Sequence, residues 1–340
     1  MSPATPPRLL VCGDVINDIL AEIAGPLTYG DDNPAAIRAR PGGSAANQAA
    51  WAASLGLDVM FAGRAGAADA GFHERELARF GVRARLAADE SAATGSILVL
   101  VRSDGERTMI TDRGANLRLR QEDVPADLLD GVTLLHLTGY SFFDPGPREV
   151  VLGLIAEARR RGLPFTVDPG SAAFLGLLAP GAFLEWTHGA AVCFPNRDEA
   201  AVLTGMTGGP AAPGTLPAGS ATARSAGTAA PAVHGAQARR PSTADALAMA
   251  SVLARHYGAV ALKLGPDGAL LTTGDAPPVR VPAFPAAVRD TTGAGDAFCA
   301  GFLAAWLTGS DQAVAVAAAA RAAARAVTVL GGRPPNSQEP

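Results

Sequence analysis

The sequence predicts an α/β fold with a mainly parallel central sheet, and two observations lead to this prediction. Short runs rich in β-branched residues and leucine recur along the chain, and stretches compatible with helix separate several of them. Alternation of strand and helix is typical of a parallel sheet covered by helices on both faces. The predicted strands lie at residues 9–11, 59–62, 134–137, 165–168, 192–194 and 260–264.

The predicted helices lie between these strands. Residues 45–55 and 150–161 are compatible with helix, and each stretch ends near a glycine, Gly56 or Gly162, as helices often do. The run 312–330 is dominated by alanine and predicts a packed closing helix. The main domain is therefore expected to span residues 8–333, with tails at 1–7 and 334–340.

Composition excludes several classes of protein. The 340 residues are 48% hydrophobic and 18% charged, which excludes a disordered or fibrous chain. A net charge of −4 gives no overall attraction to nucleic acid or to an anionic membrane. The three cysteines are far apart, and the apolar stretch 9–12 is too short for a signal peptide or a membrane span. We therefore expect a cytoplasmic protein without disulfides.

Two segments interrupt the alternation of strand and helix. Residues 15–40 and 94–113 have an extended pattern with turn signals, and the second contains a hairpin pattern at 97–101 and 108–111 around Ser103-Asp104-Gly105-Glu106. Such a hairpin could cover a site as a lid, or it could extend a sheet or form a dimer contact. Residues 205–242 consist largely of Ala, Gly, Pro, Ser and Thr, which predicts a mobile insertion.

The most informative motif runs from Asp290 to Phe298 and precedes a helical apolar pattern. Gly293 and Gly295 let the backbone approach an anion closely, and the free N–H groups at a helix start attract negative charge. Asp296 would repel a phosphate, yet it lies where a base could take a proton from an attacking hydroxyl. The alternative is that Asp296 only caps the helix.

A second glycine pair, Gly42 and Gly43, precedes the helix predicted at 45–55. The glycines would let a polar ligand approach the backbone, and the Asn47 amide offers donors and acceptors to hydroxyl groups. A plain tight turn with Asn47 as a cap is the alternative. Asp18 belongs to a polar segment that follows the first strand, where open α/β sheets bind ligands.

Two further motifs suggest a nucleotide and a metal. Asn196 and Glu199, three residues apart at a helix start, could share one face and hold hydrated magnesium, or they could cap the helix. Lys263 is the only lysine in the chain and lacks the glycine that a Walker loop requires before it. The run Lys263 to Gly268 is more typical of a strand and turn at a nucleotide pocket. The five histidines lack metal-ligand spacing, and no Gly-x-Ser-x-Gly elbow occurs.

Taken together and in this order, these motifs resemble those of the ribokinase-like (PfkB) carbohydrate kinases, over nearly the whole chain apart from residues 205–242. The resemblance implies a three-layer α/β/α sandwich with a mainly parallel sheet. It also implies a small β lid, built from the segments 15–40 and 94–113, that can serve as a dimer clasp. The expected cofactors are ATP and Mg²⁺.

The resemblance also implies roles for individual residues. Asp296 matches the general base, and Gly293, Ala294 and Gly295 match the anion hole for the transferring phosphoryl group. The remaining matches are sugar contacts at Asp18, Gly42, Gly43 and Asn47; magnesium and phosphate positioning at Asn196 and Glu199; a nucleotide border at Lys263, Gly265 and Gly268; and a monovalent-cation (K⁺) site at Asp290, the Thr292 carbonyl and the loop 326–331.

The acceptor substrate is less clear from the sequence. Ile16 and Ser44 depart from the usual ribokinase signatures, and no glutamate lies near residues 138–140 to contact ribose. Arg113 at the end of the hairpin would suit a sugar acid. The segment 32–37 is weakly similar to pseudouridine kinases, so the alternatives are a nucleoside kinase of the adenosine or pseudouridine type and a non-catalytic sugar sensor. A small sugar-like molecule is the expected partner, with neither nucleic acid nor membrane.

Overall fold

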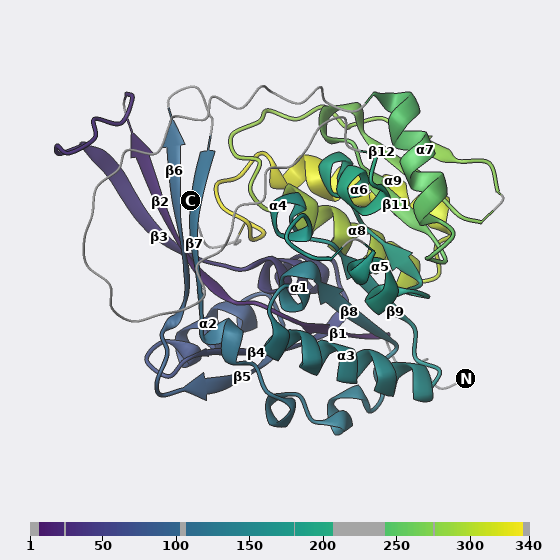
Figure 1. The fold of residues 1–340 in the computed structure, drawn as a ribbon, viewed down its shortest axis with the longest axis horizontal. Helices are drawn as coiled ribbons and strands as arrows, with labels where there is room; N and C mark the ends of the chain where they lie inside the picture. Colours follow the sequence, from purple (N-terminus) through teal and green to yellow (C-terminus); the bar gives the residue numbers. More distant parts are fainter. Residues whose placement is uncertain are drawn as a thin grey trace.

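The computed structural model describes residues 7–23, 25–102, 107–179, 181–206, 242–274 and 276–335. A nine-stranded sheet forms the centre of the described part of the chain, in the order β13-β12-β11-β10-β9-β8-β1-β4-β5 (Figure 1). Its strands are β1 (Arg8–Cys12), β4 (Asp58–Gly66), β5 (Arg83–Asp89), β8 (Leu134–Thr138), β9 (Phe165–Asp168), β10 (Val192–Cys193), β11 (Val260–Lys263), β12 (Ala269–Thr272) and β13 (Val279–Val281).

Every pair of neighbours from β11 through β5 is parallel, and β12 is antiparallel to both of its neighbours. The mainly parallel sheet and each of the six predicted strands are therefore confirmed. The sequence did not indicate β5, β12 and β13, because these strands at or near the sheet edge lack a long apolar run.

Helices cover both faces of this sheet, because alternate residues of each strand point to opposite faces. In β1, Leu9 and Val11 enter one apolar core, and Leu10 and Cys12 enter the other. The first core is built with α1 (Ser44–Ser54), α2 (Ala70–Ala78), α8 (Ala294–Leu307) and α9 (Gln312–Ala326), and the second with α3 (Pro145–Arg160), α4 (Ala172–Leu175), α5 (Ala182–Thr187), α6 (Arg197–Thr204) and α7 (Thr243–Leu253).

Two predicted helices have different bounds in the structure. The helix predicted from Val150 begins at Pro145, because proline is favoured in the first turn and Asp144 precedes it in an extended conformation. The closing helix ends at Ala326 rather than Leu330. The carbonyl of Val327 accepts hydrogen bonds from the backbone N–H groups of Arg289 and Asp290, which directs the chain after the helix back toward α8.

The segments that interrupt the alternation form a second sheet of four strands in the order β3-β2-β6-β7 (Figure 1). These strands are β2 (Ile16–Ile23), β3 (Ala35–Gly42), β6 (Thr94–Arg102) and β7 (Arg107–Gly114). β6 and β7 pair antiparallel, so the predicted hairpin is confirmed, although its turn at 103–106 lies outside the described residues. The predicted mobile insertion also lies outside them at 207–241, between α6 and α7.

Short 3-10 helices complete the described part of the chain. They lie at Ala115–Arg118, Gln121–Asp123, Ala126–Leu129, Gly139–Phe142 and Gly265–Asp267. Within the residues that the structure describes, no helix is long and apolar enough to cross a membrane.

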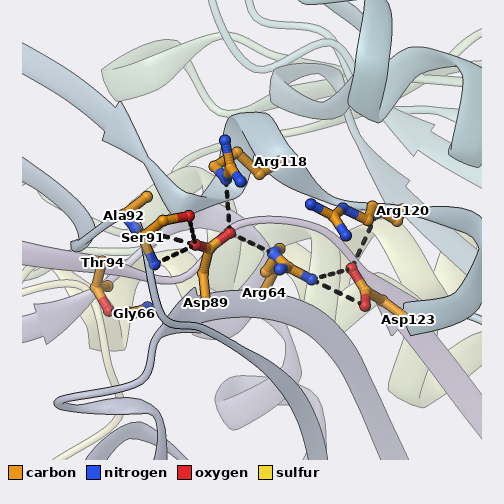
Figure 2. Close-up of polar contacts among 9 residues, drawn as sticks. All are labelled: Arg64, Gly66, Asp89, Ser91, Ala92, Thr94, Arg118, Arg120 and Asp123. Carbon is orange, nitrogen blue, oxygen red and sulfur yellow. Dashed lines mark hydrogen bonds and ion pairs between the residues drawn. The ribbon is translucent and has the colours of Figure 1, made fainter.

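A cluster of charged residues joins the two sheets where β6 leaves the main body (Figure 2). Arg64 on β4 donates from Nε to Asp89 Oδ2 over 2.8 Å and from Nη1 to both carboxylate oxygens of Asp123. Arg118 donates to the same Asp89 oxygen over 2.7 Å, and Thr94 Oγ1 on β6 accepts from the Gly66 N–H. These contacts fix the base of the four-stranded sheet on the ends of β4 and β5.

Candidate active site

Asp296 is the third residue of α8, and it does not cap the helix. The residue before α8 is Gly293, which has a left-handed φ of 74° and provides no side-chain cap. A Cβ on Gly293 would lie 2.5 Å from Gly332, so both the conformation and the packing require glycine here. The N–H groups of Gly295 and Asp296 belong to the first helical turn, where helices provide no internal acceptor. The helix start is therefore suited to an anion.

The Asp296 carboxylate points toward α1 and contacts three of its side chains. Ser44 Oγ and Gln48 Nε2 donate to Oδ1 over 2.8 and 3.1 Å, and Asn47 Nδ2 donates to Oδ2 over 3.1 Å. The two glycine-containing motifs, which are about 250 residues apart in sequence, thus meet at one carboxylate. The structure brings together the predicted base and the predicted acceptor-binding helix.

The environment makes Asp296 more basic than an ordinary aspartate. Burial raises the pKa of Asp296 to about 6, and the nearby charge of Asp168 adds to this rise. Hydrogen bonds from Ser44, Gln48 and Asn47 act in the opposite direction. At neutral pH the carboxylate is therefore mostly ionised, yet it is basic enough to accept a proton from a hydroxyl in a transition state.

Asp18 and Asn47 lie beside this carboxylate. Asn47 is buried, and its Oδ1 has no hydrogen-bond partner among the described residues, so it can accept from a ligand. The Asp18 carboxylate lies over Gly42, where a Cβ would be only 2.0 Å from Asp18 Oδ2. Burial raises the pKa of Asp18 to about 7, with a further rise from Asp14 and Asp296. These polar groups form a compact surface for a hydroxylated ligand.

Gly43 and Asp14 shape the start of α1. Gly43 has a φ of 95°, and a Cβ there would lie 2.7 Å from the Asp14 carbonyl oxygen. The Asp14 carboxylate accepts from the N–H groups of Ser44 and Ala45, over 3.1 and 3.3 Å. A carboxylate from the loop after β1 thus satisfies the first amides of α1, and Asn47 is left to face Asp296.

Arg113 projects from β7 toward the same region. Its Nη1 donates to the carbonyl of Tyr140 over 3.0 Å, and its guanidinium carbon lies 5.2 Å from the Tyr140 ring centroid. The side chain is buried, and Nε has no hydrogen-bond partner among the described residues. Asp18 and Arg113 lie on one face of the four-stranded sheet. Paired residues share a face, and Asp18 pairs with Ile97, which in turn pairs with Thr111. Arg113 is two residues after Thr111 on the same strand, so its side chain points to that face as well.

Lys263 and the two glycines after it lie at the end of β11. Gly265 and Gly268 have positive φ values, and a Cβ on Gly268 would lie 2.0 Å from the Val281 carbonyl oxygen, so the tight turn packs against β13. The amino group of Lys263 does not lie with this turn. Its Nζ donates to Asp168 Oδ1 over 3.0 Å and lies against Gly295 at the start of α8. The lysine amine therefore lies between the end of β9 and the start of α8.

Asn196 and Glu199 form a reciprocal cap at the start of α6. The Asn196 side chain accepts from the Glu199 N–H over 2.9 Å, and both Glu199 carboxylate oxygens accept from Asn196, over 2.7 and 2.8 Å. Burial raises the pKa of Glu199 to about 7, while Lys263 lowers it. Because both carboxylate oxygens already hold hydrogen bonds, the pair fits magnesium through water and not as a direct ligand.

Asp290 connects the loop before α8 with the loop after α9. Its carboxylate accepts from the Thr292 N–H over 2.7 Å and from the Gly331 N–H over 2.8 Å. Asp290 is buried, and residues 327–331 pass close to it. The predicted elements of the monovalent-cation site are thus adjacent.

Sequence reasoning gave no site role to Ser44, Gln48, His136 or Asp168, which contact Asp296 or its neighbours. Gln48 Nε2 also donates to Asp168 Oδ2 over 3.0 Å, and Gln48 Oε1 contacts His136 Nε2 in a short hydrogen bond. Polar residues at the carboxyl ends of parallel strands are candidates for a site, and this signal indicated the segment 13–18, which contains Asp14. The same signal could have identified Asp168 at the end of its strand, whereas the roles of Gln48 and His136 become visible only through their contacts.

Comparisons with known proteins agree with this arrangement. The family model described as pfkB family carbohydrate kinase matches residues 7–339. The chain is 27% identical over 341 residues to a ribokinase of Arabidopsis thaliana, covering 96% of this chain and 78% of that protein. It is also 27% identical over 307 residues to an ATP-dependent ribose-1-phosphate kinase of Halopiger xanaduensis, covering 89% of this chain and 86% of that protein.

Solved structures share the fold. A structure of Arabidopsis thaliana ribokinase complexed with ribose and ATP has a TM-score of 0.73 at 24% identity, covering 98% of this chain and 96% of that chain. An adenosine kinase from Sinorhizobium meliloti has a TM-score of 0.76 at 24% identity, covering 97% and 96%. The predicted ribokinase-like α/β sandwich is confirmed.

Proposed function

Because this chain belongs to the pfkB family of carbohydrate kinases, we propose that it transfers the γ-phosphoryl group of ATP to a hydroxyl of a small sugar or sugar acid. The observation that carries this proposal is the Asp296 carboxylate, held by three side chains of α1 at the N-terminus of α8, with its pKa raised to about 6. A base and an anion-binding helix start lie side by side, as phosphoryl transfer to a hydroxyl requires.

In the proposed reaction, the acceptor hydroxyl lies against the Asp296 carboxylate, beside Asn47. Asp296 takes the hydroxyl proton while the acceptor oxygen bonds to the γ-phosphorus and the bond to the leaving oxygen of ADP breaks. The amides of Gly293, Ala294 and Gly295 were predicted as the anion hole. The Ala294 N–H already donates to the Thr291 carbonyl over 3.3 Å, so we assign the main donation to Gly295 and Asp296.

ATP and Mg²⁺ are the proposed cofactors. Two relatives carry ATP in their names or titles, which supports ATP as the donor. Bound magnesium would neutralise charge on the phosphates, and Asn196 and Glu199 would hold its water ligands. Gly265 and Gly268 are proposed to border the nucleotide.

A monovalent cation is proposed between the loops that Asp290 connects. Asp290 and the Thr292 carbonyl would provide ligands for K⁺, and the loop 326–331 would provide others. We expect turnover to rise when K⁺ replaces a bulky organic cation in the buffer, and equal rates in the two buffers would contradict this site.

The proposed substrate class follows from the side chains beside Asp296. Asp18 and Asn47 suit hydroxyl groups, and Gly42 and Gly43 let them approach the backbone. Arg113 suits a carboxylate or a phosphate on the acceptor. Ribose is less favoured because no glutamate lies at 138–140, where the sequence has Thr138, Gly139 and Tyr140.

A nucleoside kinase is the second candidate function, and the fold shared with an adenosine kinase favours it. A non-catalytic sugar sensor is a third candidate function. It is disfavoured because such a protein would need neither the Asp296 base nor the anion-binding start of α8. Competition with free nucleosides separates the first two, since a nucleoside acceptor would inhibit phosphorylation of a sugar at a shared site.

The four-stranded sheet is proposed to act as a lid over the acceptor and as a dimer contact. Its residues Asp18 and Arg113 face the site, whereas Ile37 and Ile110 on the opposite face are 68% and 56% exposed. Exposed isoleucines on a sheet favour contact with a second copy of the chain. Analytical ultracentrifugation of the wild type and Ile110→Asp would test this, since a monomeric wild type would contradict the dimer.

The experiment that tests the proposed function measures ADP release with ATP and magnesium. The acceptor panel contains ribose, fructose, ribose 1-phosphate, 2-keto-3-deoxygluconate, inositol, adenosine and pseudouridine, with Asp296→Asn assayed beside the wild type. Turnover on one acceptor that vanishes in the variant is the expected result. ATP binding with no turnover on any acceptor would instead favour the sensor.

A further inference from the structure

Lys263 lies at the point where the transferring phosphoryl group would pass. Its ammonium nitrogen is 3.0 Å from Asp168 Oδ1, and a Cβ on Gly295 would lie 3.5 Å from it. Gly295 belongs to the first turn of α8, one residue before Asp296. The lysine amine therefore lies beside the helix start.

Two positive features meet at this position. The N-terminus of a helix carries partial positive charge, and the ammonium beside it adds to the attraction for an anion. Burial lowers the pKa of Lys263, but the combined effect of Asp168, Cys299 and Glu199 raises it more, so the ammonium remains charged. One of its three N–H groups is used by Asp168, and the ammonium can donate the others to a ligand. A single anion can therefore contact both the ammonium and the helix start.

We propose that Lys263 is a catalytic residue whose ammonium contacts the γ-phosphoryl group during transfer, and that Asp168 is the positioning residue that holds it there. The inference rests on the proposed kinase function. The acceptor oxygen forms the new bond to phosphorus, the bond to the β,γ-bridging oxygen breaks, and its electron pair leaves with ADP. The hydroxyl proton goes to Asp296, and Lys263 keeps all of its protons while it neutralises the phosphoryl oxygens.

Asp168 is built to hold the lysine in one place. It is 3% exposed, and its Oδ1 also accepts from the Gly170 N–H over 3.3 Å. Its Oδ2 accepts from Gln48 Nε2 over 3.0 Å and from Cys299 Sγ over 3.3 Å. The same Gln48 nitrogen donates to Asp296 over 3.1 Å. One amide therefore fixes the distance between the carboxylate that holds the ammonium and the carboxylate that takes the proton.

The orientation of Gln48 is determined by chemistry. Its amide nitrogen must face the two carboxylates, because a carbonyl oxygen there would be repelled. Its Oε1 consequently accepts from His136 Nε2, which must carry the proton, and His136 Nδ1 accepts from Thr166 Oγ1 over 2.7 Å. Burial lowers the pKa of His136 to about 4, so the ring is neutral at pH 7. The link between Asp168 and Asp296 is thus held rigidly by a second row of contacts.

The test compares ATP and ADP binding by calorimetry, together with kcat and KM, in the wild type, Lys263→Met and Lys263→Arg. We expect Lys263→Met to bind ADP within about twofold of the wild type and ATP about tenfold more weakly, since only ATP carries the γ-phosphoryl group. Its kcat should fall on the order of 10²-fold. Lys263→Arg, which keeps the charge, should retain more turnover than Lys263→Met, and Asp168→Asn should lower kcat with little change in KM.

Arg64→Met is the matched control, because Arg64 is also a buried cation paired with a carboxylate, at 2.8 Å, but at the base of the four-stranded sheet. It should lower stability and leave the ratio of ATP to ADP affinity unchanged. If Lys263→Met weakened the binding of ATP and of ADP equally, the proposal would be overturned, and Lys263 would only border the nucleotide. If the wild type binds ATP but phosphorylates no acceptor, the proposed function fails. The ratio of ATP affinity to ADP affinity still tests whether Lys263 contacts the γ-phosphoryl group.

A measurement on the unaltered protein covers the case in which Lys263→Met does not fold. Lys263 is the only lysine, so protein labelled with ¹⁵N-lysine gives a single side-chain ammonium resonance. MgATP should shift this resonance more than MgADP does. Equal shifts with the two nucleotides would contradict contact with the γ-phosphoryl group.

Discussion

Two groups of carboxylates that are at least partly buried in this protein have opposite electrostatic surroundings. At the base of the four-stranded sheet, Asp89 and Asp123 are held by the guanidinium of Arg64 (Figure 2). Hydrogen bonds from Arg64, from the Ser91 N–H and from Arg118 hold the pKa of Asp89 well below its ordinary value. At the start of α8, Asp296 contacts only neutral donors, and burial raises its pKa to about 6.

The opposite pKa shifts of Asp89 and Asp296 indicate that the first stabilises the fold and that the second is suited to react. A carboxylate whose pKa is lowered by partners favours the folded state at neutral pH, whereas a carboxylate whose pKa is raised by burial opposes it. Raised values are typical of functional sites, because a base must hold its charge yet accept a proton. Two arginines therefore hold Asp89 where the two sheets join. The hydrogen bonds to Asp296 come only from neutral side chains.

The largest expected effect is that of Asp296→Asn on turnover. We expect kcat to fall on the order of 10²-fold or more, because an amide cannot accept the hydroxyl proton. The fold should survive. In the wild type Asn47 Oδ1 has no hydrogen-bond partner among the described residues. If the Asn47 amide flips over, this oxygen can accept a hydrogen bond from the amide that Asp296→Asn introduces. Steady-state kinetics and circular dichroism measure both. Near-normal turnover would exclude Asp296 as the base.

The matched change in the other cluster is Asp89→Asn. Removing this charge leaves Arg118 without its partner and weakens the contact with Arg64, so the Tm should fall on the order of 5 °C. The kcat should change by less than about tenfold, or about 1.4 kcal/mol in the barrier, because Asp89 lies outside the candidate site. A large loss of kcat in a variant with normal Tm would mean that the two regions are not independent.

The pH dependence of stability should reveal both groups. The folded-state pKa values of Asp18 and Asp296, about 7 and about 6, exceed their ordinary values. The stability that they contribute is therefore fully present below about pH 4 and is lost as pH rises through 6 to 7. Asp89 acts in the opposite sense and loses its contribution in acid. Differential scanning calorimetry should show Tm falling between about pH 5 and about pH 8, less steeply in Asp296→Asn.

Asp296→Asn should also raise the Tm at pH 7 by roughly 2 °C, because it removes a carboxylate that opposes folding there. A wild-type Tm that is constant or rising from pH 5 to pH 8, with an unchanged profile in the variant, would contradict the raised pKa values.

The smallest expected effect is that of Arg118→Ala. The Arg118 side chain is 43% exposed, whereas that of Arg64 is 9% exposed, although both contact Asp89 Oδ2. Solvent screens the exposed pair, so Arg118→Ala should lower the Tm by less than about 2 °C. Arg64→Ala, measured by the same thermal melt, should lower it considerably more. Equal effects would show that burial does not decide the strength of these contacts.

Much of the fold and part of the candidate site were predictable from local pattern. The parallel strands have apolar runs, and the glycines before α1 and α8 mark helix starts because they adopt conformations or close approaches that other residues disfavour. Asp296 was identifiable because its position relative to a helix start is a local property. Asp168 had a weaker signal at the end of a strand, and the roles of Gln48 and His136 had none.

The sequence by itself determined the α/β class, the hairpin of the second sheet and the residue types that phosphoryl transfer needs, because these depend on spacing over a few residues. Only the tertiary structure decided which of those residues act together. It brought Asn47 to Asp296 from about 250 residues away, and it placed the amine of Lys263 against Asp168 and Gly295. Burial and the identity of neighbours set the charge of each group, and both arise only when the chain packs.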